Sequence, residues 1–414
     1  GKLRSMRSQL RSPESGRRAV LAATTALTAS LLPFRVPALA VPFSDLPAVV
    51  PLYLCGGAYC LAYAIDEQPF KGVADTGSPF ILVDGTCSAA DMQTSKTAAL
   101  ANIWGCFRGT GQPSGLADTS ELFGGQDVGV QWRRGAFRLE QLKIDDELRL
   151  MPRIDDAVFG VVREITENRG GSGVFLGLCK RRLPRIRPTL LEQIDVAALR
   201  FDFLKRTLEL SRTSLIPRSA VDAVRLVDLR LAGAPVANYA CRVDRLYVNG
   251  RAVALDKPCV AVIDTGTTGV SVSDELFDSG LIPQQWRDAR IEFATEHRGT
   301  CAVEASVKKR RKPSAGIPAI ELPLDAPEYD EFPLVVSPVH VPWFEPGFGN
   351  EECADGEPYQ CNGRPIGQRK PFLETLRFRA LGLGPSPHVL FIGMTFLWQR
   401  QLTIDIDDGR MTVV

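Results

Sequence analysis

Several common enzyme signatures are missing from this sequence. It has three histidines and, among ten cysteines, no Cys-x-x-Cys pair, so no zinc site is expected. It also contains no Gly-x-Ser-x-Gly elbow, no His-Glu-x-x-His and no glycine-rich phosphate or dinucleotide loop. These absences exclude the usual serine-hydrolase, zinc-peptidase and nucleotide-dependent chemistries, and we expect neither a metal nor a cofactor.

Long apolar runs and broad basic stretches are missing too. The apolar run Ala19–Leu32 is too short to span a bilayer and no other segment reaches that length, which predicts no stable membrane insertion. The net charge is +1, but residues 1–40 hold seven Lys or Arg against Glu14 alone, which leaves the remainder at −5. A mildly acidic body lacks the positive surface that phosphate backbones require, so nucleic acid is not an expected partner.

Residues 1–40 have the composition of a targeting signal. Arg17-Arg18 precedes the apolar run and Ala38-Leu39-Ala40 follows it, which is typical of a cleavable export signal of twin-arginine type. The stretch before this signal is poor in acidic residues, like a plastid transit segment, so the thylakoid lumen is the favoured destination. Secretion to the extracellular space or delivery to a vacuole stays open.

The ten cysteines allow up to five disulfides in an exported chain. We predict the pairs that are close in sequence, since each would staple a local loop: Cys55/Cys60, Cys87/Cys106 and Cys353/Cys361.

From Val41 onward, short runs of β-forming residues are separated by Gly, Pro, Asp and Asn. Examples are Pro51–Cys55, Leu61–Ile65 and Asp127–Trp132, whereas helical patches such as Leu190–Leu199 are brief. This pattern predicts an all-β protein in which helices serve as connectors.

The most informative feature is a repeat at half the length of the chain. Segment 72–78, Gly-Val-Ala-Asp-Thr-Gly-Ser, returns as 261–267, Ala-Val-Ile-Asp-Thr-Gly-Thr. Further on, 173–178, Gly-Val-Phe-Leu-Gly-Leu, returns as 389–394, Val-Leu-Phe-Ile-Gly-Met. Because both elements recur in the same order, we expect two lobes built on one plan, residues 41–218 and 219–414, which divide near Pro217–Val224.

With two copies of Asp-Thr-Gly and an apolar-Gly element after each, the sequence resembles the pepsin-like aspartic protease family from about Val49 to Val414. The resemblance implies a bilobal all-β fold with a cleft between the lobes, and an aspartic endopeptidase with Asp75 and Asp264 as its catalytic residues. We expect a monomer that acts on peptide or protein substrates. A single Asp-Thr-Gly is more often a turn that closes a hairpin, but the symmetric pair weighs against that interpretation.

The residue types agree with this chemistry. An apolar strand that ends in Asp pushes a carboxyl into a dry environment, where the pKa rises. If Asp75 and Asp264 meet, they hold one shared proton over the acidic range, so that one acts as a base and the other as an acid on a water molecule.

Neighbouring residues have roles that follow from their size and chemistry. The glycine of each motif lets backbone N–H groups approach the carboxylates, and the hydroxyl that follows it can donate to an outer carboxyl oxygen. The resemblance implies that the two motif threonines hydrogen-bond across the lobe interface. The supporting residues are Thr76, Gly77, Ser78, Thr265, Gly266 and Thr267.

The resemblance also implies a hairpin flap that closes over the cleft and usually carries a Tyr before a Gly-rich turn. The best candidate is Phe123-Gly124-Gly125, in which Phe123 keeps the ring and lacks the hydroxyl. Leu82 stands where many members place a Trp that is the usual partner of that Tyr. These departures predict either reduced activity or shifted specificity.

Two alternatives to a peptidase stay open at this stage. A catalytically weak or inactive binding or inhibitor protein could be built on the same scaffold, because a fold does not fix its function. Phe123 favours that alternative, while the two complete Asp-Thr-Gly motifs disfavour it. A structural β-sandwich protein without a site would require the repeat to be a coincidence.

Overall fold

The computed structural model describes residues 48–55, 58–86, 104–123, 126–140, 153–165, 174–183, 186–297, 299–306, 334–339 and 378–414. All of them belong to one compact unit, Leu39–Val414. The predicted targeting segment 1–40 lies outside the described residues, as do Cys87, Cys353, Cys361, Gly124 and Gly125.

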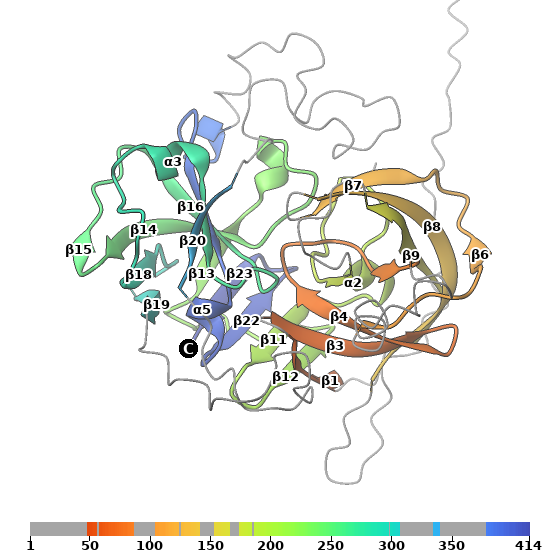
Figure 1. Ribbon diagram of the computed structural model, residues 1–414. Helices are drawn as coiled ribbons and strands as arrows, with labels where there is room; N and C mark the ends of the chain where they lie inside the picture. Colours follow the sequence, from red (N-terminus) through yellow and green to blue (C-terminus); the bar gives the residue numbers. More distant parts are fainter. Residues whose placement is uncertain are drawn as a thin grey trace, which may run out of the picture. The chain divides into compact units, whose positions relative to one another are not determined.

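Strands make up almost all of the regular structure in these ranges, which confirms the all-β prediction (Figure 1). Short helical elements interrupt them, among them α2 (Leu190–Gln193), α3 (Asp274–Asp278), α5 (Met394–Leu397), the 3-10 turn η2 (Leu229–Ala232) and the helical residues 378–380. Within the described ranges the strands form one sheet of nine and one of fourteen.

The nine-stranded sheet is built from the first half of the chain. Its main order is β10 (Phe175–Gly177), β4 (Gln68–Asp75), β3 (Ala58–Ile65), β8 (Gln126–Leu139), β9 (Arg153–Ile165) and β5 (Leu82–Asp84). On its flanks, β2 (Tyr53–Cys55) pairs with β3, while β6 (Gln112–Pro113) and β7 (Thr119–Phe123) pair with β8. Cys55 and Cys60 are joined by the predicted disulfide across β2 and β3.

The fourteen-stranded sheet combines both halves of the sequence. Its first part is β1 (Ala48–Pro51), β12 (Thr207–Ser211), β11 (Ala198–Asp202), β22 (Gln401–Asp405), β23 (Arg410–Val413) and β13 (Val224–Val227). It continues through β14 (Ala240–Val248), β16 (Cys259–Ile263), β21 (His388–Ile392), β17 (Val270–Ser273) and β20 (Val336–Val339), with β15 (Arg251–Ala252), β18 (Asp288–Phe293) and β19 (Cys301–Ser306) beside them. Strands from before residue 218 therefore pair directly with strands from the end of the chain.

The sequence repeat is matched by a repeat in strand pairing. In the first copy, β4 pairs antiparallel with β3 and parallel with β10, and β5 pairs parallel with β9. In the second copy, β16 pairs antiparallel with β14 and parallel with β21, and β17 pairs parallel with β20. Each Asp-Thr-Gly thus follows a strand that lies between two others.

Burial explains why β16 and the second half of β4 consist mostly of apolar residues. All five residues of β16 are buried, as are the last four of β4, because each strand has neighbours on both sides and a packed layer on both faces.

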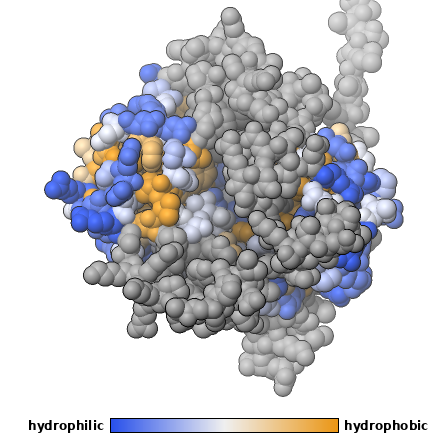
Figure 2. All heavy atoms as spheres, in the orientation of Figure 1, coloured by the Kyte–Doolittle hydropathy of each residue, from blue (hydrophilic) through white to orange (hydrophobic). Residues whose placement is uncertain are grey.

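The edge of the larger sheet is more exposed than its centre. Val335, just before β20, is 55% exposed, and Figure 2 shows orange hydrophobic areas among the hydrophilic residues of the described surface. Among the helices of the described ranges, none has the length and apolar character that membrane crossing requires.

Candidate active site

The two Asp-Thr-Gly motifs meet, although 189 residues separate them. Asp75 ends β4 and is 5% exposed, and Asp264 directly follows β16 and is half-buried. Each motif glycine lies against the carboxyl group of the other motif. A methyl group on Gly77 would fall 2.8 Å from the carboxyl carbon of Asp264, and one on Gly266 would fall 2.6 Å from that of Asp75. Only a residue without a side chain fits at either position.

The threonines expected to bridge the two motifs make reciprocal hydrogen bonds. The Thr76 hydroxyl accepts from the Thr265 backbone N–H at 3.0 Å and donates to the Ile263 carbonyl at 2.8 Å. The Thr265 hydroxyl accepts from the Thr76 N–H at 3.1 Å and donates to the Ala74 carbonyl. Because each hydroxyl is both donor and acceptor, four buried polar groups are satisfied at once.

This network gives a stability prediction. Thr76→Val keeps the shape of the side chain but leaves the buried Thr265 N–H and Ile263 carbonyl without their partner, at a cost of about 2–4 kcal/mol in the free energy of unfolding. Thr76→Ser retains the hydroxyl and serves as the matched control, for which most of that loss is absent. Urea unfolding followed by circular dichroism measures both variants, and equal losses for Val and Ser would contradict the role of the hydroxyl.

Within each motif, backbone and side-chain donors orient the carboxylates. The Gly77 N–H donates to Asp75 Oδ1 at 2.7 Å, and the Gly266 N–H donates to Asp264 Oδ1 at 2.9 Å. The Thr267 hydroxyl donates to Asp264 Oδ2 at 2.8 Å, and the Ser78 side chain hydrogen-bonds to Asp75. All six predicted supporting residues therefore contact the carboxyl groups or link the two motifs.

Burial is the main cause of an altered acidity at this site. It raises the pKa of Asp75 well above its ordinary value, and the nearby charge and hydrogen bonding of Asp264 raise it further. The hydrogen bonds from Ser78 and Gly77 act in the opposite direction and are outweighed. Asp75 therefore keeps its proton at a pH where an exposed aspartate is ionised.

The raised pKa predicts a pH-dependent cost to stability. Below the pKa of the unfolded state, near 3.8, Asp75 is protonated in both the folded and the unfolded protein, and its burial does not change the free energy of unfolding. As the pH rises toward the folded-state pKa, Asp75 ionises only in the unfolded protein, so the free energy of unfolding falls. The loss is about 1.4 kcal/mol for each unit by which folding raises the pKa. Asp75→Asn removes this titration while its Oδ1 can still accept from Gly77.

Thermal unfolding of wild type and Asp75→Asn at pH 4, 5.5 and 7 measures this effect. We expect the advantage of the variant to grow with pH. Asp155→Asn, at a side chain that is 60% exposed, provides the control and gives a difference that stays small throughout. A difference between wild type and Asp75→Asn that does not change with pH would contradict the prediction.

The apolar-Gly elements pack against the backbone of the two loops that carry the Asp-Thr-Gly motifs. The Leu178 N–H donates to the Asp75 carbonyl at 2.8 Å, and the Met394 N–H donates to the Thr267 carbonyl at 2.8 Å. A methyl group on Gly177 would lie 2.4 Å from the Phe80 nitrogen, and one on Gly393 would lie 2.1 Å from the Thr267 carbonyl oxygen. The glycine is needed because the loop backbone passes too close for any side chain.

No protein-family model matches this chain, and a search of curated proteins finds no significant match either. In the part of the chain that the structure describes, no three His, Cys, Asp or Glu side chains converge as metal ligands.

A buried thiol next to the pair was not foreseen from the sequence. Cys179 is fully buried, and its Sγ donates to the Thr76 carbonyl at 3.0 Å. Burial raises the pKa of this thiol well above its ordinary value, and the charges of Asp75 and Asp264 add to the shift. Asn238, 5% exposed, also reaches the site, since its Nδ2 lies 3.5 Å from the Gly77 carbonyl oxygen.

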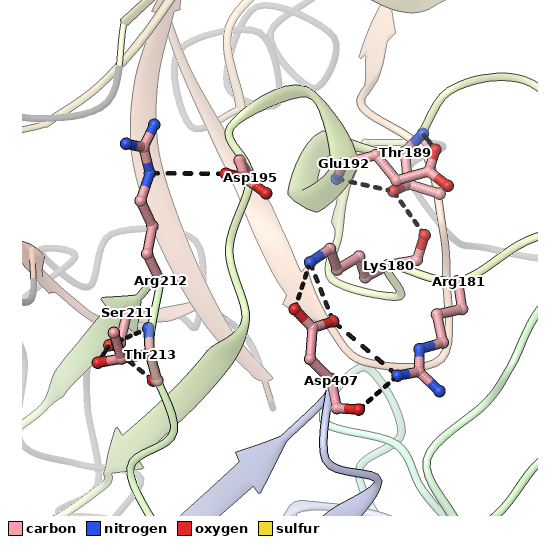
Figure 3. Close-up of polar contacts among 9 residues, drawn as sticks. All are labelled: Lys180, Arg181, Thr189, Glu192, Asp195, Ser211, Arg212, Thr213 and Asp407. Atoms are coloured by element: carbon pink, nitrogen blue, oxygen red, sulfur yellow. Dashed lines mark hydrogen bonds and ion pairs between the residues drawn. The ribbon is translucent and has the colours of Figure 1, made fainter. Parts of the chain in front are cut away.

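Contacts from the end of the chain hold the loop that follows Cys179. Lys180 Nζ lies 3.0 Å from both carboxylate oxygens of Asp407, and the Arg181 guanidinium donates to the Asp407 carbonyl at 2.7 Å (Figure 3). The Thr189 hydroxyl donates to the Lys180 carbonyl at 3.0 Å and, with Glu192, forms the capping box that begins α2. No sequence signal identifies these contacts, because Asp407 lies 227 residues from Lys180.

The predicted flap segment has the pairing of a hairpin. Strands β7 and β8 run antiparallel from Thr119↔Val130 to Phe123↔Gln126, which places Gly124 and Gly125 between them in sequence. These two glycines lie outside the described residues, and only the backbone of Phe123 is described. Leu82 is fully buried in a cluster with Phe80 and Trp132.

Proposed function

We propose that this chain is an aspartic endopeptidase of bilobal pepsin-like architecture, with Asp75 and Asp264 as its catalytic residues. The observation that carries the proposal is the position of each motif glycine against the carboxyl group of the opposite motif, which requires the two carboxyl groups to be neighbours. The reciprocal threonine bonds and the raised pKa of Asp75 support the same conclusion.

The mechanism follows from a pair that holds one proton. Asp75, whose pKa is raised, carries the proton and donates a hydrogen bond to the carbonyl oxygen of the scissile peptide. Asp264, as the base of the pair, takes a proton from a water molecule as the water oxygen bonds to the carbonyl carbon. The proton on Asp75 moves to the carbonyl oxygen, which gives a tetrahedral diol without a covalent link to the enzyme.

Collapse of this intermediate completes the reaction. The proton held by Asp264 passes to the amide nitrogen, the carbon–nitrogen bond breaks, and a diol hydroxyl returns its proton to Asp75. The pair ends in its starting protonation state. The fixed N–H donors from Gly77 and Gly266 keep both carboxyls oriented throughout, so little reorganisation is needed during the reaction.

A peptide-library digest from pH 3 to 8, with and without a statine-type inhibitor, tests the proposal. The inhibitor places a hydroxyl where the tetrahedral diol forms, so we expect it to abolish cleavage that is fastest in mildly acidic solution. Cleavage that resists the inhibitor would contradict the mechanism. Tight binding of peptides or of a partner enzyme without turnover would instead support a binding or inhibitor protein on this scaffold.

A further inference from the structure

A series of buried hydrogen bonds runs from β7 toward residues 75–80, which we call the Asp75 loop. Trp132 Nε1 donates to the Thr119 hydroxyl at 2.9 Å, and that hydroxyl donates to Glu121 Oε1 at 2.8 Å. An indole N–H can only donate, so the hydroxyl must accept from it and direct its own hydrogen to the carboxylate. The donors and acceptors of these two hydrogen bonds can therefore be arranged in one way only.

The three side chains share one face of the hairpin. Thr119 and Glu121 are two residues apart on β7, and Thr119 pairs with Val130, two residues from Trp132 on β8. All three are almost completely buried, with exposed fractions of 5%, 1% and 2% for Thr119, Glu121 and Trp132. A carboxylate in such a place is costly unless its charge is balanced.

Arg187 supplies that balance. It is 8% exposed, its guanidinium carbon lies 5.7 Å from the centre of the Trp132 ring, and it donates to the Ala117 carbonyl at 2.7 Å. Burial lowers the pKa of Arg187, and the charge of Glu121 opposes that shift, so the two charged groups stabilise each other around the indole.

The other side of the indole reaches the Asp75 loop. The Trp132 and Phe80 rings meet edge to face, with centroids 5.0 Å apart. Phe80 lies five residues after Asp75, and its carbonyl accepts from the Gly177 N–H at 2.7 Å. Gly177 is the register partner of Asp75 in the pairing of β10 with β4. A displaced indole would thus disturb the loop that carries the carboxyl group.

We propose that Glu121, Thr119 and Trp132 form a positioning unit that fixes the Asp75 loop for catalysis, with Glu121 anchoring the indole from β7. The catalytic part of this inference depends on the proposed peptidase function. The unit touches neither Asp75 nor Asp264 and acts through Phe80. Its loss therefore lowers kcat and leaves KM nearly unchanged, because a small misplacement of a reacting group slows the chemical step.

Thr119→Val, which removes the relaying hydroxyl at constant shape, is the first test. We expect kcat per folded molecule to fall about 10-fold, with KM within about 2-fold of wild type. Thr119→Ser restores the hydroxyl and returns kcat to within about 2-fold of wild type. Glu121→Gln tests the anchor itself, and Glu209→Gln, which alters a partly buried Arg–Glu pair on β12, is the control that leaves kcat unchanged.

Deuterium uptake at residues 75–80 gives a readout that does not require activity. If the positioning unit holds the Asp75 loop, deuterium uptake at residues 75–80 increases in Thr119→Val and Glu121→Gln but not in Glu209→Gln. A lower Tm with unchanged kcat and unchanged uptake would overturn the proposal, as would equal behaviour of Val and Ser at position 119. If the wild type cleaves no peptide, the peptidase function fails, and uptake at residues 75–80 alone decides whether the unit positions the loop. If Thr119→Val does not fold, Glu121→Gln decides the same question.

Discussion

Asp75→Asn and Asp264→Asn should each lower the rate of peptide hydrolysis about 10³-fold or more, with the protein still folded. Asparagine has nearly the shape of aspartic acid and keeps one oxygen that can accept from the motif glycine. It can neither take a proton from water nor give one to a peptide oxygen. Because the base and the acid act in the same step, replacement of either aspartate removes most of the contribution that acid–base catalysis makes to the rate.

Initial rates on a peptide identified in the library digest measure this effect. Circular dichroism and the unfolding midpoint establish that the variants are folded, and Asp75→Asn has the added signature of greater stability at neutral pH. Asp405→Asn is the matched control, since Asp405 is a buried aspartate on β22 whose pKa is also raised, chiefly by burial, yet it hydrogen-bonds to Ser214 rather than to the pair. Wild-type turnover in Asp75→Asn or Asp264→Asn would refute the proposed function.

Gly77→Ala and Gly266→Ala form the second large prediction. The added carbon would lie 2.8 Å from the carboxyl carbon and Oδ1 of Asp264 in the first variant, and 2.6 Å from those atoms of Asp75 in the second. Such distances are below contact, so the carboxyl group must move. A displacement of about 1 Å costs on the order of 10²-fold in rate, so we expect kcat to fall by at least that factor.

The effect on stability should be smaller than the effect on rate. A methyl group forced into a packed site costs about 1–3 kcal/mol, and part of this is relieved when the carboxyl rotates away. Gly109→Ala is the control, since its added carbon would lie nearest to the flexible end of Gln68, at 3.1 Å, and to the ring of Phe107, at 3.3 Å, rather than to either motif carboxyl group. Steady-state kinetics and urea unfolding of the three variants separate the two effects. Full activity in Gly77→Ala would show that Asp264 tolerates displacement and would contradict the proposed geometry.

Part of the site was predictable because its signals are local. An apolar strand followed by Asp-Thr-Gly is read from seven neighbouring residues, and the later apolar-Gly element repeats in the same order. These patterns report which residues are buried and where each strand ends, as β4 and β16 bear out. The hydroxyl at Ser78 or Thr267 is likewise within three residues of the carboxyl that it contacts.

Other parts of the site had no local signal. Cys179 looked like one of ten ordinary cysteines, yet it donates to the Thr76 carbonyl. Glu121 lay in a segment considered only for its flap turn, and its burial beside Thr119 depends on a strand pairing that propensities do not specify. Arg187, distant in sequence from both, adds the opposite charge.

The all-β composition, the internal repeat and the two acidic residues could all be predicted from the amino-acid order, because strand periodicity and motif spacing depend on neighbours a few positions away. Three features became visible only in the folded chain: those residues meet, the threonines exchange hydrogen bonds across 189 positions, and β1, β11 and β12 join strands from the end of the chain. The physical reason is that such contacts arise from the packing of whole sheets, and their energy depends on burial and on distances that no short segment of the chain contains.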